Sequence, residues 1–200
     1  MRKLQLTMPP SPHKKILLIL DLDETLIFAT TESLVRKEDF KVGDYFVYNR
    51  PYLAAFLQTM HKHFTLAVWS SASDDYVTSI VEQITPVDVS FAFIWGRSRC
   101  TYKRNVLESS YINNDYQEYY YTKPLKKVKK KGYSLEKILT VDDSPYKVAQ
   151  NYGNAIYPKE YRGDVEDEEL KYLATYLETL KDCKNVRTVE KRGWRAQVDV

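Results

Sequence analysis

The feature that most constrains the fold is a short apolar run that leads directly into two aspartates. Residues 16–20 read ILLIL, Asp21 and Asp23 follow within three positions, and Thr25 comes two residues later. A continuous apolar run of this length predicts a strand that is buried on both faces of a parallel sheet. Two carboxylates at the end of such a strand need a physical reason, because burial and mutual repulsion both disfavour their charged forms.

Further along the chain, apolar runs alternate with segments that have helical spacing. Pro51 stands where a helix could begin, Ser73 could cap the next helix, and a short helix is expected from Pro145. This alternation predicts an α/β fold with a doubly wound, Rossmann-like, mostly parallel sheet and helices on both faces. The expected strands span residues 16–20, 64–69, 91–95, 137–141 and 154–158, and a closing amphipathic helix spans residues 166–182.

Residues 95–136 interrupt the alternation. Aromatic and polar residues are mixed there, and the turn-forming sequence NND at residues 113–115 predicts a small β-rich insert over residues 95–122. We found no internal repeat, so we expect one domain that contains this insert. The expected divisions of the chain are an N-terminal arm (1–14), the domain itself (15–182) and a C-terminal extension (183–200).

Polar residues follow three of the expected strands at the point where each strand ends. Asp21 follows the first strand, Ser70 the second, and Asp142 and Asp143 the fourth, so they should meet at one edge of the sheet. A cluster of carboxylates needs a compensating cation, and oxygen ligands without His or Cys select a hard ion such as Mg²⁺. A carboxylate beside Mg²⁺ can attack phosphorus, and a second acid such as Asp23 can protonate the leaving group. The residues therefore predict phosphoryl transfer.

Two of these motifs resemble those of the haloacid-dehalogenase superfamily. The sequence DLDET at residues 21–25 resembles its D-x-D-x-T signature, and VDDSP at residues 141–145 resembles its fourth motif. A closer likeness, over roughly residues 15–180, is to the FCP-homology phosphatases, also called NLI-interacting-factor-like or small C-terminal-domain phosphatases. The segments that resemble this family are NRPYLAAFL (49–57), VWSSAS (68–73), RSRC (97–100) and YYTKPLKKV (120–128).

The resemblance implies a role for each matching residue. Asp21 would be the nucleophile, and Asp23 would be the general acid and base, with its backbone carbonyl also binding Mg²⁺. Lys123 would neutralise the phosphoryl charge and orient Asp21. The metal ligands would be Asp21, Asp23, Asp143 and, directly or in support, Asp142. The residues that bind phosphate or substrate would be Ser70, Ser71, Arg97 and Lys123, and Thr25 would support the phosphate-binding loop.

Some of these residues also have structural interpretations. Ser70 could be a turn residue or a helix cap. Six of the nine residues at 123–131 are lysine, so Lys126 or Lys127 could be functional in place of Lys123. Arg97 competes with arginines at positions 99 and 104. The lysine run could be a solvated helix face, or it could attract anionic substrates.

The spacing of the motifs predicts an open site without a large cap domain. About two dozen residues separate Thr25 from Pro51, which is enough for a hairpin but too few for a globular cap. An open site suits a phosphate on a macromolecule, and the resemblance implies phosphoserine or phosphothreonine in a protein. The alternatives are phosphate ends of nucleic acid, small phosphorylated metabolites and, in another class, a non-catalytic phosphopeptide-binding module.

Composition predicts a soluble cytoplasmic protein. The net charge of +3 does not by itself imply nucleic-acid binding, and two cysteines are too few for a disulfide scaffold. The basic N-terminus lacks the apolar stretch of a signal peptide, and the longest aliphatic run, at residues 16–20, is far short of a membrane span. We expect a phosphoprotein as the main partner, nucleic acid as a less favoured one, and no membrane partner.

Overall fold

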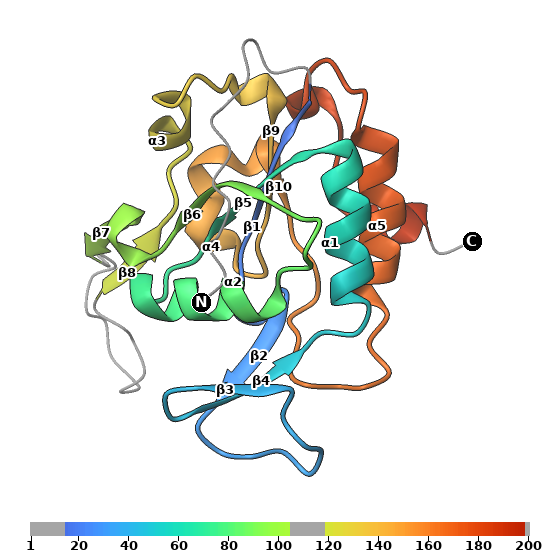
Figure 1. Cartoon of the computed structure of the whole chain (residues 1–200). Coiled ribbons are helices and arrows are strands. Elements are labelled where there is room, and N and C mark those ends of the chain that lie inside the picture. The colour runs from blue at the N-terminus through green and yellow to red at the C-terminus, as the bar shows by residue number, and fades with distance from the viewer. Residues whose placement is uncertain (1–14, 105–118, 199–200) are drawn as a thin grey trace, which may run out of the picture.

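A computed structural model of the chain describes residues 15–104 and 119–198. Its centre is a parallel sheet of five strands in the order β10-β9-β1-β5-β6 (Figure 1). The expected parallel sheet is confirmed, and the predicted N-terminal arm lies outside the described residues. The strands are β1 (Leu17–Leu20), β5 (Thr65–Trp69), β6 (Phe91–Trp95), β9 (Ile138–Val141) and β10 (Ala155–Ile156).

The strand β1 lies in the middle of the sheet and is buried on both faces. Its first residue, Leu17, is in register with Thr65 of β5 and Ile138 of β9. Because side chains alternate along a strand, Leu18 and Leu20 point into one core while Leu17 and Ile19 point into another. This two-sided burial explains why residues 16–20 are apolar without interruption.

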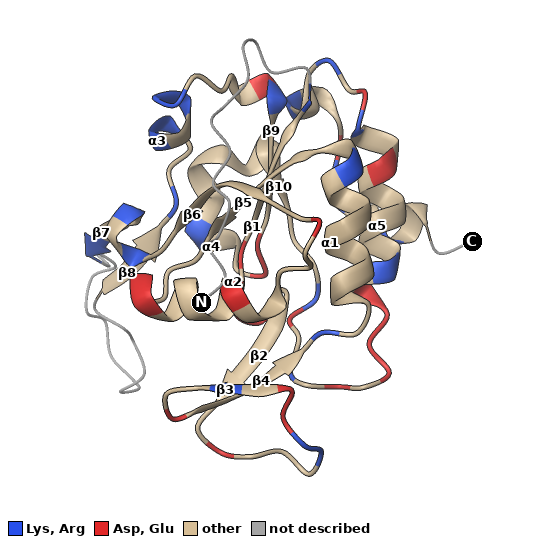
Figure 2. Ribbon diagram, viewed as in Figure 1, with Lys and Arg blue, Asp and Glu red and all other residues tan. Residues whose placement is uncertain are grey.

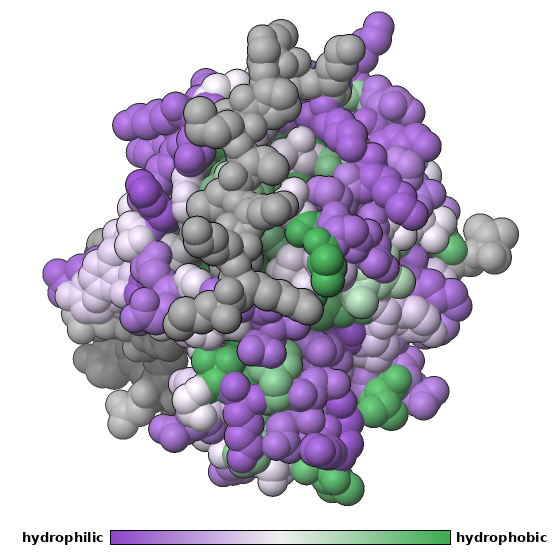
Figure 3. Space-filling view, in the orientation of Figure 1, coloured by the Kyte–Doolittle hydropathy of each residue, from purple (hydrophilic) through white to green (hydrophobic). Residues whose placement is uncertain are grey.

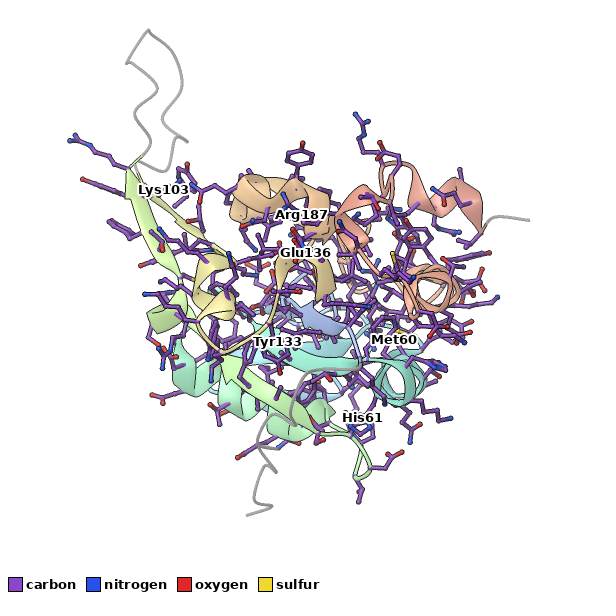
Figure 4. The ribbon with its side chains drawn as sticks, turned by 90° about the horizontal axis from the view of Figure 1, so that it is seen from above. Met60, His61, Lys103, Tyr133, Glu136 and Arg187 are labelled. Atoms are coloured by element: carbon purple, nitrogen blue, oxygen red, sulfur yellow. The ribbon has the colours of Figure 1, made fainter. Side chains whose placement is uncertain are left out.

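Helices cover both faces of the sheet, as predicted. The face of Leu18 packs against α1 (Leu53–His63), α2 (Asp74–Ile84) and α5 (Glu169–Leu180), while the face of Leu17 packs against Val128 of the short helix α3 (Lys126–Lys129). Met60 and Tyr133, both labelled in Figure 4, belong to these two different cores. On the face seen in Figure 3, hydrophilic residues predominate and apolar residues form separate spots.

Two small antiparallel sheets flank the parallel sheet. The segment with room for a hairpin holds one, formed by β3 (Phe40–Val42) and β4 (Tyr45–Asn49), and β2 (Ile27–Thr30) adds a third strand in the order β2-β4-β3. The predicted β-rich insert is confirmed as a pair of strands, β7 (Thr101–Arg104) and β8 (Tyr119–Thr122). Residues 105–118 of the insert, including its predicted turn, lie outside the described residues.

Several element ends differ from their predicted positions. Pro51 is not the first helical residue, because Tyr52 takes a left-handed conformation (φ +66°) before α1 begins. The closing helix begins at Glu169 and not at residue 166, since the Asp167 carboxylate accepts a hydrogen bond from the Glu169 backbone nitrogen at 3.0 Å. The last strand is only two residues long, and Pro158, which lacks a backbone donor, follows shortly after it.

The predicted C-terminal extension packs on the domain. Trp194 is 4% exposed, its ring centre lies 5.7 Å from that of Tyr176 in a tilted arrangement, and its indole N–H donates to the Tyr157 carbonyl at 3.0 Å. Two short 3₁₀ turns lie in this segment: Val186–Thr188 packs near residues 135–137 and 149–154, and Trp194–Gln197 packs against α5. Among the described residues, no helix has the length and apolar character needed to cross a membrane.

Candidate active site

The carboxyl ends of three neighbouring strands bring the predicted residues to one edge of the sheet. Each of these residues continues the ladder by one hydrogen bond from its backbone nitrogen. Asp21 donates to the Val141 carbonyl at 3.0 Å, and Ser70 donates to the Trp95 carbonyl at 2.9 Å. Asp142 likewise follows β9. The strand ends therefore fix the backbone positions from which these side chains project.

Asp21 is 2% exposed and is surrounded by donors. Its Oδ1 accepts from the Leu22 backbone nitrogen at 2.9 Å, and its Oδ2 lies 2.8 Å from the Nζ of Lys123 and 3.2 Å from the Nζ of Lys147. Burial alone would raise the pKa of Asp21, but the two ammonium groups outweigh it and lower that pKa. The surroundings of Asp21 therefore favour its ionised form.

Asp23 has a different environment, although it lies only two residues away. The Tyr76 hydroxyl donates to its Oδ1 at 2.7 Å, and the Ser70 hydroxyl donates to its Oδ2 at 3.4 Å. Burial raises the pKa of Asp23; the Tyr76 hydrogen bond opposes this shift, and the charge on Asp21 adds to it. A carboxyl group with a raised pKa is suited to donate a proton.

Between Asp23 and Thr25, the backbone of Glu24 turns through the left-handed region with φ +56°. Burial, followed by the charges on Asp23 and Asp143, raises the pKa of Glu24 to about 7. The turn allows Thr25 to reach Asp143, where its hydroxyl donates to Oδ1 and accepts from the backbone nitrogen, both at 3.2 Å. Thr25 thus ties the loop after β1 to the loop after β9.

The carboxylates of Asp21, Asp142 and Asp143 form a group that could hold a metal ion, since one oxygen of each lies within 4.8 Å of the others. Burial, together with the Asp21 charge, raises the pKa of Asp142 to about 7. Three carboxylate oxygens fit Mg²⁺ in the chemistry of their donors. The Asp23 carboxylate is not in this group, and the part predicted for it in metal binding is that of its backbone carbonyl.

Lys123 is distinguished from its lysine neighbours by burial. Its Nζ lies 2.8 Å from Asp21 Oδ2 and 2.7 Å from Asp142 Oδ2, and the residue is 2% exposed. Lys126 is exposed on α3, whose basic residues are blue in Figure 2. The Nζ of Lys127 donates to backbone carbonyls, at 2.8 and 2.9 Å. Of these three lysines, Lys123 is the one whose ammonium contacts the carboxylate cluster.

Arg97 links the end of β5 to the hairpin of β7 and β8. Its Nε donates to the Ser71 carbonyl at 2.8 Å, and its guanidinium lies 5.2 Å from the centre of the Tyr121 ring. The Ser70 hydroxyl accepts from the Ala72 nitrogen at 3.0 Å, which is the turn interaction anticipated for this serine. Ser70 therefore combines a turn role with contact to Asp23, while Arg97 and Ser71 shape the rim.

Lys147 and Tyr76 contact the aspartates but were not singled out in the sequence analysis. Lys147 lies four residues after Asp143, and the helix α4 (Pro145–Val148) directs it back to the site. Tyr76 lies in the first turn of α2 and reaches Asp23. The (i, i+4) spacing of Asp143 and Lys147 was a usable signal. No such signal pointed to Tyr76, because its spacing on the helix is that of the apolar positions and indicated a core residue.

The buried guanidinium of Arg50 holds the loop that follows Asp23. Arg50 is 1% exposed, and its Nη1 donates to the Thr25 carbonyl at 2.9 Å. Its Nε and Nη2 bind the Asp167 carboxylate at 2.8 and 2.9 Å, and Nη2 also donates to the Lys159 carbonyl at 2.8 Å. One side chain thus connects three segments that are distant in sequence.

The fold and the site together define the class of haloacid-dehalogenase-like phosphohydrolases, in which an Asp-x-Asp-x-Thr loop follows a central parallel strand. More narrowly, the chain belongs to the NLI interacting factor-like phosphatase family, whose model matches residues 16–187. This match confirms the resemblance drawn from the motifs.

Curated relatives cover most of this chain. It is 27% identical over 193 residues to nuclear envelope morphology protein 1 of Saccharomyces cerevisiae, covering 88% of this chain and 42% of that protein. It is 25% identical over 197 residues to CTD nuclear envelope phosphatase 1B of Danio rerio, covering 90% of this chain and 73% of that protein. The chain therefore spans less than half of the length of the yeast relative.

A solved structure supports the fold. The structure of Fcp1, described as an essential RNA polymerase II CTD phosphatase, aligns with a TM-score of 0.54 at 16% identity, covering 92% of this chain and 61% of that chain.

The names of the yeast and Danio rerio relatives correct one prediction, because both place those proteins at the nuclear envelope. The expectation of a plainly cytoplasmic protein, which rested on composition and an absent signal peptide, is therefore wrong.

Proposed function

We propose that this chain is a Mg²⁺-dependent phosphomonoesterase that acts through an aspartyl-phosphate on Asp21. The observation that carries the proposal is the different surroundings of two neighbouring carboxyl groups: Asp21 is ion-paired with the buried Lys123, whereas Asp23 accepts hydrogen bonds from hydroxyl groups. Lys123 and Lys147 outweigh burial and lower the pKa of Asp21, while burial raises the pKa of Asp23. Acid and nucleophile are commonly separated in this way within one site.

In the proposed mechanism, a carboxylate oxygen of Asp21 attacks phosphorus, and the bond from phosphorus to the leaving oxygen breaks. Asp23 gives its proton to that leaving oxygen, then takes a proton from the water that hydrolyses the aspartyl-phosphate. Lys123 holds Asp21 in place, and its ammonium group balances the negative charge of the phosphoryl group. The Ser70 hydroxyl stabilises the phosphoryl group by hydrogen bonding. Mg²⁺, held by Asp21, Asp142 and Asp143, would neutralise charge on the phosphoryl oxygens.

The substrate that we propose is phosphoserine or phosphothreonine on a protein. The support is that, in the part of the chain that the structure describes, the two flanking antiparallel sheets have only three and two strands, so neither is a globular cap. A relative named CTD small phosphatase-like protein 2, from Dictyostelium discoideum, agrees with such a substrate. Arg97 and Ser71, at the rim beside the Tyr121 ring, are the residues proposed to meet the substrate around its phosphate.

The test is hydrolysis of an aryl phosphate and of phosphopeptides by Asp21→Asn, with Asp182→Asn as the matched control. Asp182 is exposed after α5, so the same chemical change there should leave turnover unchanged. Asp21→Asn should lose turnover while thermal unfolding remains cooperative. Undiminished turnover in Asp21→Asn would refute the mechanism. Acid-quenched protein should also carry a hydroxylamine-sensitive phosphoryl group that the Asn variant lacks.

The same experiment separates the alternative substrates. Exposed lysines at 126, 129 and 130 of the α3 region are the observation that would favour phosphate ends of nucleic acid. Faster hydrolysis of phosphorylated oligonucleotides than of phosphopeptides, with a steep salt dependence, would support that substrate instead. Phosphopeptide binding without any turnover would point to a non-catalytic module, and preferential turnover of sugar phosphates would point to a metabolite.

A further inference from the structure

Lys147 points at the same carboxylates that could hold a metal ion. Its Nζ lies 3.2 Å from Asp21 Oδ2 and 3.9 Å from both Asp142 Oδ1 and Asp143 Oδ1. These three aspartates are the ones whose oxygens lie within 4.8 Å of each other. The Nζ of Lys123 pairs with two of the three, Asp21 at 2.8 Å and Asp142 at 2.7 Å.

The fold holds Lys147 in this position. The residue lies in α4, one helical turn after Asp143, and its side chain is 11% exposed. Its backbone carbonyl accepts a hydrogen bond at 2.7 Å from the backbone nitrogen of Lys123, so the positions of the two lysines are linked. A cavity of about 50 Å³ beside Lys147, lined also by Tyr120 and Tyr146, gives the side chain room to withdraw.

A divalent cation and an ammonium group have opposing demands here. Both are attracted to the same three carboxylates, while their like charges repel each other. Without a divalent ion, three close carboxylates of low exposure need cationic neighbours if they are to remain ionised. With a divalent ion, the ammonium becomes an unfavourable neighbour.

We propose that Lys147 is the resident counter-cation of the metal-free site and that it competes with Mg²⁺ for Asp21, Asp142 and Asp143. The inference rests on the proposed metal site and adds a residue that sets its affinity. Mg²⁺ binding requires the ammonium to move away from the carboxylates. The wild-type protein therefore binds Mg²⁺ more weakly than the three carboxylates alone would allow, and it tolerates the absence of the metal better.

The test is calorimetric titration of the full chain with Mg²⁺, together with thermal unfolding with and without the ion. Lys147→Met keeps the length of the side chain without its charge. It should tighten the dissociation constant for Mg²⁺ on the order of tenfold or more, and it should lower the melting temperature of the metal-free protein. Lys147→Arg keeps the charge and should bind Mg²⁺ with an affinity close to wild type.

The control is Lys129→Met, the same substitution at an exposed lysine of α3, which should change neither quantity. Lys147→Gln, also neutral, serves if Lys147→Met does not fold, and each protein is purified with Mg²⁺ before the ion is removed. Unchanged or weaker Mg²⁺ binding in both neutral variants overturns the competition while leaving the proposed metal site intact. Failure of every variant and of wild type to bind Mg²⁺ overturns the metal site itself, and the competition with it.

Discussion

Arg50 offers a quantitative test of how the loop of residues 21–25 is supported. Its guanidinium is fully buried against an Asp167 carboxylate that is 11% exposed, with Nε–Oδ1 at 2.8 Å. Two neutral acceptors, the carbonyls of Thr25 and Lys159, complete its hydrogen bonds at 2.9 and 2.8 Å. Substitution Arg50→Met removes all of these donors but keeps much of the apolar stem.

The expected loss follows from what remains behind. Removing one partner of a buried ion pair costs about 3–5 kcal/mol, because the other charge stays buried without compensation. Arg50→Lys keeps the charge but cannot span four acceptors with one ammonium, so a smaller loss of about 2 kcal/mol is expected. With a urea slope of about 2 kcal/mol/M, the unfolding midpoint of Arg50→Met should fall by about 1.5–2.5 M.

Urea unfolding followed by tryptophan fluorescence measures this midpoint. The matched control is Arg192→Met, because Arg192 pairs with Glu190 at a similar distance, 2.6 Å, but both side chains are largely exposed. Its midpoint should stay at the wild-type value. A double variant, Arg50→Met with Asp167→Leu, should be less destabilised than the sum of its parts. If Arg50→Met loses less than about 1 kcal/mol, the pair does not support the loop as argued.

Three further predictions concern single residues. Tyr76→Phe removes the hydrogen bond that opposes the rise in the pKa of Asp23, so that pKa should rise further. Since a general acid must be protonated, the alkaline limb of the pH–rate profile should move to higher pH. Because the pKa of Glu24 is about 7 in the folded protein against an ordinary value of 4.5, its contribution to stability should be lost from pH 4.5 to 7. In urea unfolding at several pH values, Glu24→Gln should therefore show a smaller fall than wild type, and Asp142, whose pKa is also raised to about 7, should account for part of the fall that remains. Gly163→Ala, at φ +91°, should cost about 1–2 kcal/mol, whereas Gly153→Ala, whose nearest neighbour would be 3.7 Å away, should not.

Much of the site could be predicted because it is carried by short segments. Asp21 and Asp23 follow a strand whose apolar run is read directly, and Asp142 and Asp143 follow another. Strand ends of a parallel sheet meet at one edge whatever the connections between them. The structure brings these residues together, and their catalytic roles remain proposals for the experiments above.

The contacts that set the charge state of the aspartates could not be predicted in the same way. Tyr76 has the helical spacing of a core residue, and its hydroxyl finds Asp23 only because α2 packs beside the loop after β1. The segment before α1 had room for a hairpin, but its third strand could not be predicted, because pairing between residues as far apart as Ile27 and Asn49 is not a local property. Localisation was misjudged, because amino-acid composition does not specify where in the cell a protein resides.

By itself, the sequence determined the parallel sheet, its strand ends and the family, because apolar periodicity and the DLDET and VDDSP motifs are local patterns. Only the tertiary structure decided which of several lysines meets Asp21. Lys123 and Lys147 are 102 and 126 residues away from it in the chain, and their neighbours Lys126 and Lys127 have the same chemistry. Burial distinguishes Lys123 and Lys147 from these neighbours. A lysine can be buried at this edge of the sheet only where its ammonium is paired with carboxylates, and the packing of β8 and α4 produces that pairing.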